Sequence, residues 1–298
     1  MLLSDFRAFQ GAQILVYAIA ILGLNLLVGF NGQISLGHGA FYALGAYVAA
    51  ILMDRFGVPY WATLPAAAAI CLAAGFLFGL PALRLEGHYL ALATFGLALS
   101  VPQLLKDHAI QRWTGGVEGI TLVKPDPPAG LALSADKWLY LFVLLVTALL
   151  FAAARNLLRG RIGRALMAIR DHQVAAEAMG INAAFYKSAI FGVSAMYTGI
   201  AGALGAIIVQ YVSPDSFPIF LSIFLLVGVV VGGVASLWGA LVGAAFLLIA
   251  PDLAGEVSKS ATGAVYGAIL IVTMYRLPVG VKAQLRSLLK HRPPADHG

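Results

Sequence analysis

The sequence predicts an all-α, polytopic membrane protein, a bundle of about nine transmembrane helices within a range of eight to ten. Of the 298 residues, 61% are hydrophobic and only 11% are charged, and the mean hydropathy is +0.90. The apolar residues form long charge-free runs rather than periodic stripes, which is typical of helices in lipid. The cations lie outside these runs. We therefore expect residues 1–298 to form one transmembrane domain.

Charge-free runs give the expected helices. Six of them can each span a bilayer once: residues 9–30, 34–53, 60–83, 87–105, 138–154 and 188–208. The run 216–250 would be about 52 Å long as one helix, against a hydrocarbon core of roughly 30 Å. It is therefore expected to turn back at Gly232, Gly233 and Ser236, and residues 260–275 supply the last helix. A re-entrant segment within 216–250 is the alternative.

The distribution of cations predicts the orientation. The loop 155–187 carries six of them, against the two acids Asp171 and Glu177: Arg155, Arg159, Arg161, Arg164, Arg170 and Lys187. Loops so rich in Lys and Arg face the cytoplasm. The N-terminus and the segment 106–137 are then expected outside, and the basic tail 276–298 in the cytoplasm. Because topology explains the net charge of +6, no nucleic-acid partner is expected.

The loop 155–187 is expected to be structured. Its apolar residues recur at spacings of three to five, which predicts short amphipathic helices: Ala165, Ile169, Val174, Ala176, Met179 and Ile181. Gly180 is expected to break the chain between two of these helices. A loop with one apolar and one basic face is suited to contact a partner protein. The alternative is a solvated connector that only sets topology.

No catalytic residue, metal site or cofactor is expected in this chain. The charge-free runs offer no carboxylate to bind sodium or relay a proton, which argues against an ion-coupled carrier or channel. The histidines lack metal-ligand spacing, and the one cysteine, Cys71, cannot form a disulfide within the chain. No lysine follows a glycine, so the G-K-[ST] core of a phosphate-binding loop is missing. ATP-driven transport would need another chain as its motor.

Neutral polar residues of the apolar runs are the candidates for a path that carries a small polar solute: Asn31, Gln33, Ser35, His38, Thr94 and Ser194. The alternative is that each one hydrogen-bonds a neighbouring helix. Four G-x-x-x-G pairs predict close helix packing, at Gly75 and Gly79, Gly228 and Gly232, Gly239 and Gly243, and Gly263 and Gly267.

Four stretches together resemble the LivM-type permease subunits of branched-chain amino acid ABC importers. They are GFNGQISLGHGAFYALGAY at 29–47, TGGVEGI at 114–120, GRALMAIRDHQVAAEAMGIN at 163–182 with Lys187, and VVVGGVASLWGALVGA at 229–244. The resemblance implies a multi-pass protein of the bacterial inner membrane. Its implied partners are a second, LivH-like permease, two ABC ATPase subunits that hold ATP and Mg, and a periplasmic substrate-binding protein. Urea, amides or other amino acids are the alternative substrates.

The resemblance also assigns residues to the partners. ABC importers carry an E-A-A-x-x-x-G loop that docks on the ATPase; here Ala175, Ala176 and Gly180 match, and Val174 replaces the glutamate. The residues implied to couple to the ATPase subunits are Gly163, Arg164, Arg170, Asp171, Ala175, Ala176, Glu177 and Gly180. Thr114, Gly115 and Gly116 are implied to contact the binding protein.

Overall fold

The computed structural model describes residues 4–82, 88–127, 133–257 and 262–276, and it confirms an all-α bundle. The long helices are α1 (Asp5–Asn31), α2 (His38–Phe56), α3 (Tyr60–Ala82), α4 (His88–Leu105), α6 (Ala135–Arg159), α9 (Ala183–Val209), α10 (Ile219–Gly232), α11 (Gly239–Val257) and α12 (Thr262–Arg276). The short elements are α5 (Gln111–Thr114), α7 (Arg161–Asp171), α8 (Gln173–Ala178), the 3-10 turn η1 (Pro214–Ser216), β1 (Ile120–Thr121) and β2 (Tyr211–Val212).

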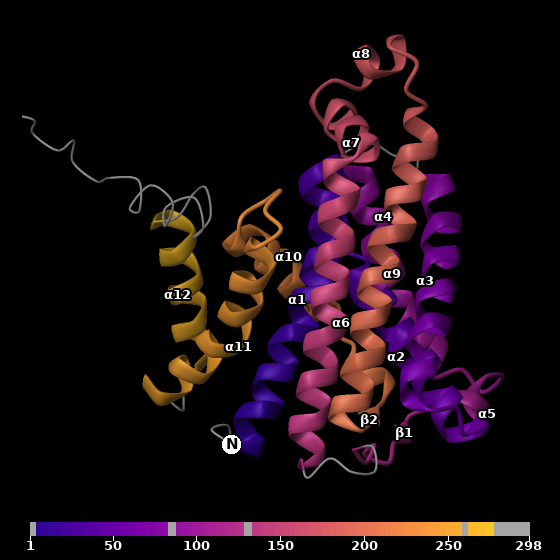
Figure 1. The fold of residues 1–298 in the computed structure, drawn as a ribbon, viewed down its shortest axis with the longest axis vertical. Helices are drawn as coiled ribbons and strands as arrows, with labels where there is room; N and C mark the ends of the chain where they lie inside the picture. Colours follow the sequence, from indigo (N-terminus) through magenta and orange to yellow (C-terminus); the bar gives the residue numbers. More distant parts are fainter. Residues whose placement is uncertain (1–3, 83–87, 128–132, 258–261, 277–298) are drawn as a thin grey trace, which may run out of the picture.

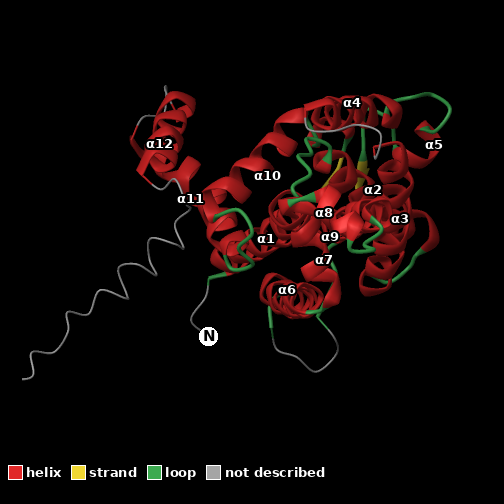
Figure 2. Cartoon of the chain, turned by 90° about the horizontal axis from the view of Figure 1, so that it is seen from above, coloured by secondary structure: helices red, strands yellow, loops and turns green. Residues whose placement is uncertain are grey.

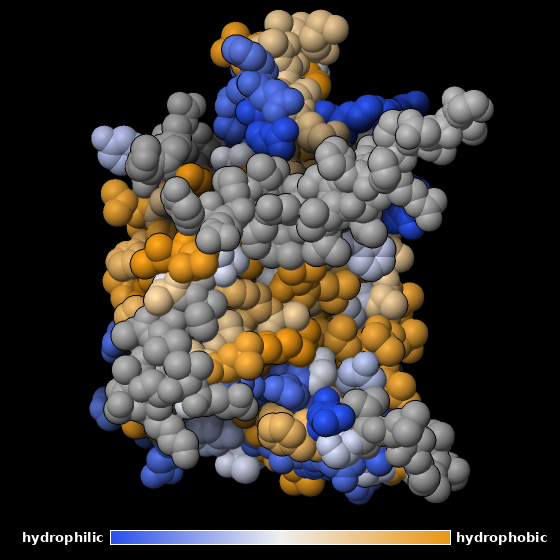
Figure 3. All heavy atoms as spheres, turned by 90° about the vertical axis from the view of Figure 1, so that its left-hand side faces the viewer, coloured by the Kyte–Doolittle hydropathy of each residue, from blue (hydrophilic) through white to orange (hydrophobic). Residues whose placement is uncertain are grey.

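Helices α1, α6 and α9 run along the length of the bundle (Figure 1). Within the described residues, five helices are long and apolar enough to cross a membrane alone, so the total of nine crossings stays a prediction. The expected reversal inside 216–250 is confirmed, because α10 ends at Gly232 and α11 begins at Gly239. Figure 3 shows a hydrophobic band around the middle of one face, with hydrophilic residues toward both ends.

The core of the bundle lies around α1 and α9. Their apolar spans are 78% and 83% buried, against 28% for α3 and 22% for α6, so the last two face the surroundings. Figure 2 shows α1, α2 and α9 inside, with α3, α4 and α6 around them and α12 at the edge. Helices α1, α2 and α3 all pack on α9, so a displacement of α9 would reach three helices directly.

Small residues allow this close packing. A Cβ on Gly45 of α2 would collide with the carbonyl of Gly199 in α9, and a Cβ on Gly199 would collide with the Cys71 sulfur of α3. The expected packing is confirmed for the first three G-x-x-x-G pairs, which lie against α9 or join α10 to α11. For Gly263 and Gly267 it stays a prediction, because no described atom of this chain lies within 4 Å of a Cβ placed there. α12 packs on α11 at the edge and buries neither glycine.

The two ends of the bundle differ. α7 and α8 project from one end, and the N-terminus, α5, β1 and β2 lie at the other (Figure 1). The arrangement agrees with the expectation that the N-terminus and the segment 106–137 lie opposite the loop 155–187. In Figure 1, α12 ends toward the α7 end; residues 277–298 of the expected tail lie outside the described residues.

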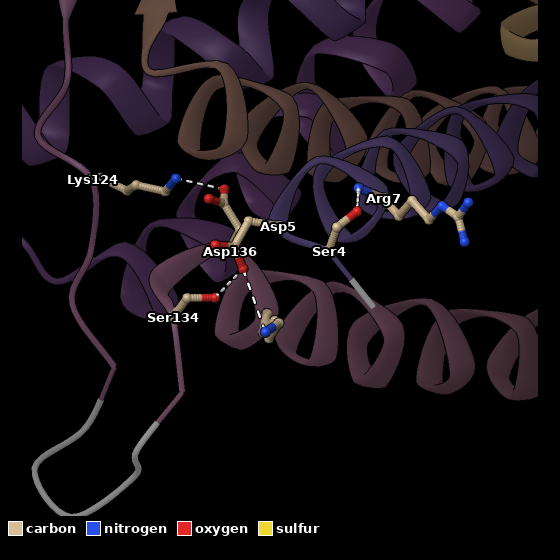
Figure 4. A network of polar contacts seen from close by, with 7 residues as sticks. Ser4, Asp5, Arg7, Lys124, Ser134 and Asp136 are labelled. Carbon is tan, nitrogen blue, oxygen red and sulfur yellow. Dashed lines mark hydrogen bonds and ion pairs between the residues drawn. The ribbon is translucent and has the colours of Figure 1, made fainter. Parts of the chain in front are cut away.

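Polar contacts tie the N-terminal ends of α1 and α6 together (Figure 4). The Ser134 hydroxyl donates to Asp5 over 2.6 Å, and Lys124 forms an ion pair with Asp136. Nearby, β1 pairs antiparallel with β2, with Ile120 opposite Val212. The segment 106–137 is therefore attached both to the start of α6 and to the end of α9.

The predicted short helices of the loop and a break at Gly180 are both present, but the break at Gly180 does not lie between the two short helices. His172, in extended backbone with φ −156° and ψ 93°, separates α7 from α8. Gly180, with φ 84°, instead separates α8 from the long helix α9. Asn182 caps α9 by accepting a hydrogen bond from the backbone N–H of Phe185 over 3.0 Å, so that helix already begins outside the apolar run.

Candidate functional site

The chain is non-helical between α1 and α2. Gly32 ends α1 in the left-handed conformation, with φ 76°, and α2 starts only at His38. Backbone N–H groups released by such a break need partners in an apolar interior. Side-chain hydroxyls accept three of them: Thr94 from Leu36 at 2.9 Å, Ser35 from Gly37 at 3.3 Å and Ser222 from Gly39 at 2.9 Å. α4 and α10 thereby hold the break in place.

His38 joins this break to α1 and α9. The Ser194 hydroxyl donates its one proton to the carbonyl of Gly23 over 2.6 Å, so it must accept from His38 Nε2, which lies 2.6 Å away. His38 Nε2 therefore carries a proton, and Nδ1 lies 3.0 Å from the Ser35 hydroxyl, within hydrogen-bond distance. Gly23 lies about 12 Å before the end of α1, which places the start of α2 well inside the bundle.

The six predicted path residues all lie in or beside this polar core, and all are buried. Ser35, His38, Thr94 and Ser194 take part in the hydrogen bonds above, and Asn31 donates to Gln33 over 2.9 Å at the end of α1. The structure thus brings residues from α1, α2, α4 and α9 to one place. Their role in carrying solute stays a prediction.

A second polar connection joins α1 to the turn between α10 and α11. The Asn25 side chain donates to the carbonyl of Ser236 over 3.0 Å and accepts from the N–H of Ala235 over 2.9 Å. The turn can approach because Gly29 has no side chain: a Cβ there would lie 2.5 Å from the Ala235 nitrogen. Ala235 itself has φ 59°, so the turn is held in a conformation that few residues adopt freely.

Arg170 of α7 reaches the same part of α1. Its guanidinium donates to the carbonyl of Gly29 over 2.8 Å, close to the C-terminal end of α1, where a cation is favourable. A Cβ on Gly32 would lie 2.9 Å from Cγ of Arg170, so the arginine stem lies directly over this glycine. Gly29 therefore lies between α7 and the α10–α11 turn. The sequence reasoning missed this link, although two glycines three residues apart at the end of a helix mark a close approach.

The eight predicted coupling residues divide into two groups. Six are exposed and available to a partner: Arg164, Arg170, Asp171, Ala175, Glu177 and Gly180. Gly163 and Ala176 are buried against this chain: a Cβ on Gly163 would collide with the carbonyl of Leu158, and Ala176 packs with Ile169 and Ala183. Their small size thus serves the packing of the loop itself.

Two large apolar side chains are exposed at α8. They are Val174 within the helix and Met179 directly after it, 79% and 84% exposed, at the end where α8 projects from the bundle (Figure 1). The other side of α8 is held by Lys187, which donates to Gln173 over 2.6 Å. Val174, which replaces the glutamate of the importer loop, therefore presents an apolar contact where that glutamate would present a charge.

At the opposite end, Thr114, Gly115 and Gly116 form a turn rather than a projecting surface. The Thr114 hydroxyl donates to the carbonyl of Leu105 over 2.9 Å and accepts from the N–H of Gly116 over 3.2 Å. Both glycines have positive φ, 72° and 57°. The side chain that projects beside this turn is Trp113, which stacks on Phe56 with ring centroids 6.2 Å apart. Contact with a binding protein stays a prediction for all three turn residues.

The sequence matches known permeases over most of its length. Residues 10–274 match the family model described as "Branched-chain amino acid transport system / permease component". The chain is 34% identical to the high-affinity branched-chain amino acid transport system permease protein LivM of Escherichia coli K12, over 95% of this chain and 72% of that protein.

Two further relatives agree. LivM of Salmonella typhimurium LT2 is also 34% identical, over 93% of this chain and 70% of its own length. The permease protein BraD of Pseudomonas aeruginosa is 23% identical over 89% of this chain and 91% of its own length. No solved structure matches. With its bundle of apolar helices and this match over residues 10–274, the chain belongs to the family of permease components of branched-chain amino acid transport systems.

Proposed function

We propose that this permease component carries leucine, isoleucine or valine across the bacterial inner membrane, from a binding protein outside to the cytoplasm, while ATP is hydrolysed on other subunits. The observation that carries the proposal is the α7–α8 loop, which projects from the bundle with exposed apolar side chains and is attached internally to α1. A solvated connector would need neither feature.

In the proposed coupling, an ATPase subunit binds the exposed residues of α8 and the loop, among them Ala175, Glu177 and Gly180. Movement of α8 would pass to α9 through the cluster around Ala176 and through the Lys187 contact. Movement of α7 would pass to α1 through Arg170 and onward to the α10–α11 turn through Asn25. Both routes end at helices that enclose the polar core around His38, where the solute path is proposed.

The proposed assembly contains this permease, a second related permease, two ATPase subunits that hold ATP and Mg, and a substrate-binding protein. The N-terminus and the segment 106–137 would lie outside, where the turn at Thr114 would meet the binding protein. The loop 155–187 and the tail 276–298 would lie in the cytoplasm. In this arrangement residues 1–298 form one transmembrane domain and hold no cofactor of their own.

The test is uptake into vesicles that contain the assembled transporter, with ATP held constant and the proton and sodium gradients collapsed. We expect uptake to continue, to need both ATP and the binding protein, and to be competed by leucine more strongly than by urea or short amides. The purified chain alone should show no ATP hydrolysis. Immediate loss of uptake when the gradients collapse would identify an ion-coupled carrier, and stronger competition by amides would change the substrate.

A further inference from the structure

A groove runs along the outside of the bundle between α6 and the α10–α11 turn. α6 and α11 both pack on α1, and the space left between them has a volume of about 310 Å³. Leu144 and Phe151 of α6 line one side, Leu237 and Trp238 line the other, and Leu15 of α1 forms the floor. From Leu144 to Arg155 the groove follows α6 for about 16 Å, at 1.5 Å per residue.

The groove is apolar along its length and cationic at one end. Its one hydroxyl, on buried Thr147, donates its proton to the carbonyl of Val143 in the same helix over 2.7 Å, so it has no proton to donate to a ligand. Arg155 ends the groove on the side that carries α7. Within the part of the chain that the structure describes, its guanidinium forms no hydrogen bond or ion pair. Trp238, also at the wall, is more than half exposed.

We propose that this groove binds one anionic phospholipid, with an acyl chain along Leu144 and Phe151 and the headgroup phosphate on Arg155. The chemistry of the walls fits this ligand, because a long apolar slot with one terminal cation matches an acyl chain with one terminal anion. Basic pockets between transmembrane helices on the cytoplasmic side bind such headgroups. An amino acid substrate has too little apolar length and would leave its ammonium group without an acceptor in the groove.

A helix of a second permease is the competing occupant. It would cover Arg155 in an apolar interface, which is costly unless it supplies a buried anion. A lipid leaves the arginine at the membrane surface, where a cation attracts anionic headgroups and an indole is favourably placed. The groove also borders the turn that Asn25 holds, so a bound lipid would lie against the same turn from the membrane side.

The probe is fluorescence of Trp238 in the full-length chain, with Trp61, Trp113 and Trp138 replaced by Phe. The protein is reconstituted in phosphatidylcholine vesicles that contain increasing fractions of phosphatidylglycerol or phosphatidylcholine with brominated acyl chains, which quench nearby indoles. We expect brominated phosphatidylglycerol to reach half-maximal quenching at about fivefold lower mole fraction. One cation near a membrane surface contributes about 1 kcal/mol, which corresponds to this factor.

Variants distinguish a specific lipid site at Arg155 from a general attraction of anionic lipids to the basic end of α6. Arg155→Gln should abolish the preference, while Arg159→Gln, one turn further along α6, should leave most of it. Ala148→Phe, which adds bulk inside the groove, should reduce quenching by both lipids. Equal quenching by both lipids in the unsubstituted groove, or equal effects of the two arginine variants, would overturn the proposal. So would loss of all quenching on assembly with the second permease, because the groove would then be a protein interface.

Discussion

Arg170→Gln distinguishes an internal link from a contact with the ATPase. In the structure Arg170 is exposed enough to reach a partner, yet its guanidinium donates to the carbonyl of Gly29 over 2.8 Å. Glutamine removes the charge and shortens the side chain. If the link is internal, the variant should loosen α7 in the purified chain even without any partner.

The expected size follows from the contact. Hydrogen bonds to charged groups contribute about 1.5 to 3 kcal/mol, and because the Arg170 side chain is 34% exposed we reduce this contribution to about 1 to 2 kcal/mol. The ion pair with the exposed neighbour Asp171, at 2.9 Å, adds little. Such a loss shifts the equilibrium between docked and undocked α7 by a factor of about 5 to 30.

Hydrogen exchange of the α7 amides in the purified chain measures this shift, since local opening sets the exchange rate. Exchange should rise about 5- to 30-fold in Arg170→Gln. The matched control is Arg164→Gln on the same helix. Among the described residues its guanidinium hydrogen-bonds only the carbonyl of Arg159, at 3.5 Å, so this variant should exchange like the unsubstituted chain. Unchanged exchange together with lost binding of the ATPase subunits would show that Arg170 is a partner contact and refute the reasoning.

Three further substitutions test the other connections. Gly29→Ala should lower the free energy of unfolding by about 1 to 3 kcal/mol and reduce transport, because its Cβ would lie 2.5 Å from the Ala235 nitrogen. Thermal unfolding measures the loss of stability, and the control is Gly96→Ala, where nothing lies within 4 Å of the added Cβ. In Gly180→Leu the added Cβ meets no atom within 4 Å, but the backbone at φ 84° is strained by about 1 to 2 kcal/mol, so the chain should insert normally and co-purify with less ATPase. Unchanged co-purification would contradict a docking role for the junction between α8 and α9. Ser194→Ala leaves the N–H of His38 Nε2 without its acceptor, at about 1 to 3 kcal/mol, whereas the Gly23 carbonyl keeps its hydrogen bond within α1; a variant that unfolds at the temperature of the unsubstituted chain would argue against the proposed hydrogen-bond chain.

The positions of the helices were predictable because lipid requires long apolar runs. The structure places helices over all the charge-free runs, and it places the reversal at the expected Gly232 and Gly233. Helix ends were less predictable, since a charged residue marks the edge of the hydrocarbon and not the end of the hydrogen bonding. Residues 138–154 thus lie within the longer helix α6, and Ala183 begins α9 outside its apolar run.

The sequence predicted which residues belong to the candidate site, but not which residues they hydrogen-bond. Polarity within an apolar run singled out His38, Thr94 and Ser194, yet their partners lie on helices far apart in the sequence. The start of α2 at His38, rather than at residue 34, depends on hydroxyls of α4 and α10 that accept the released backbone N–H groups. The contact of Arg170 with Gly29 likewise joins residues that no local pattern relates.

The packing of α3 against α9 provides a chemical reporter. Cys71 is the one cysteine in 298 residues and is fully buried, with its sulfur at the place that a side chain on Gly199 would occupy. A membrane-permeant maleimide can reach this thiol only when the two helices separate. The rate at which Cys71 is alkylated therefore reports how often α3 separates from α9. Comparing this rate between resting and transporting vesicles shows whether the two helices separate during transport.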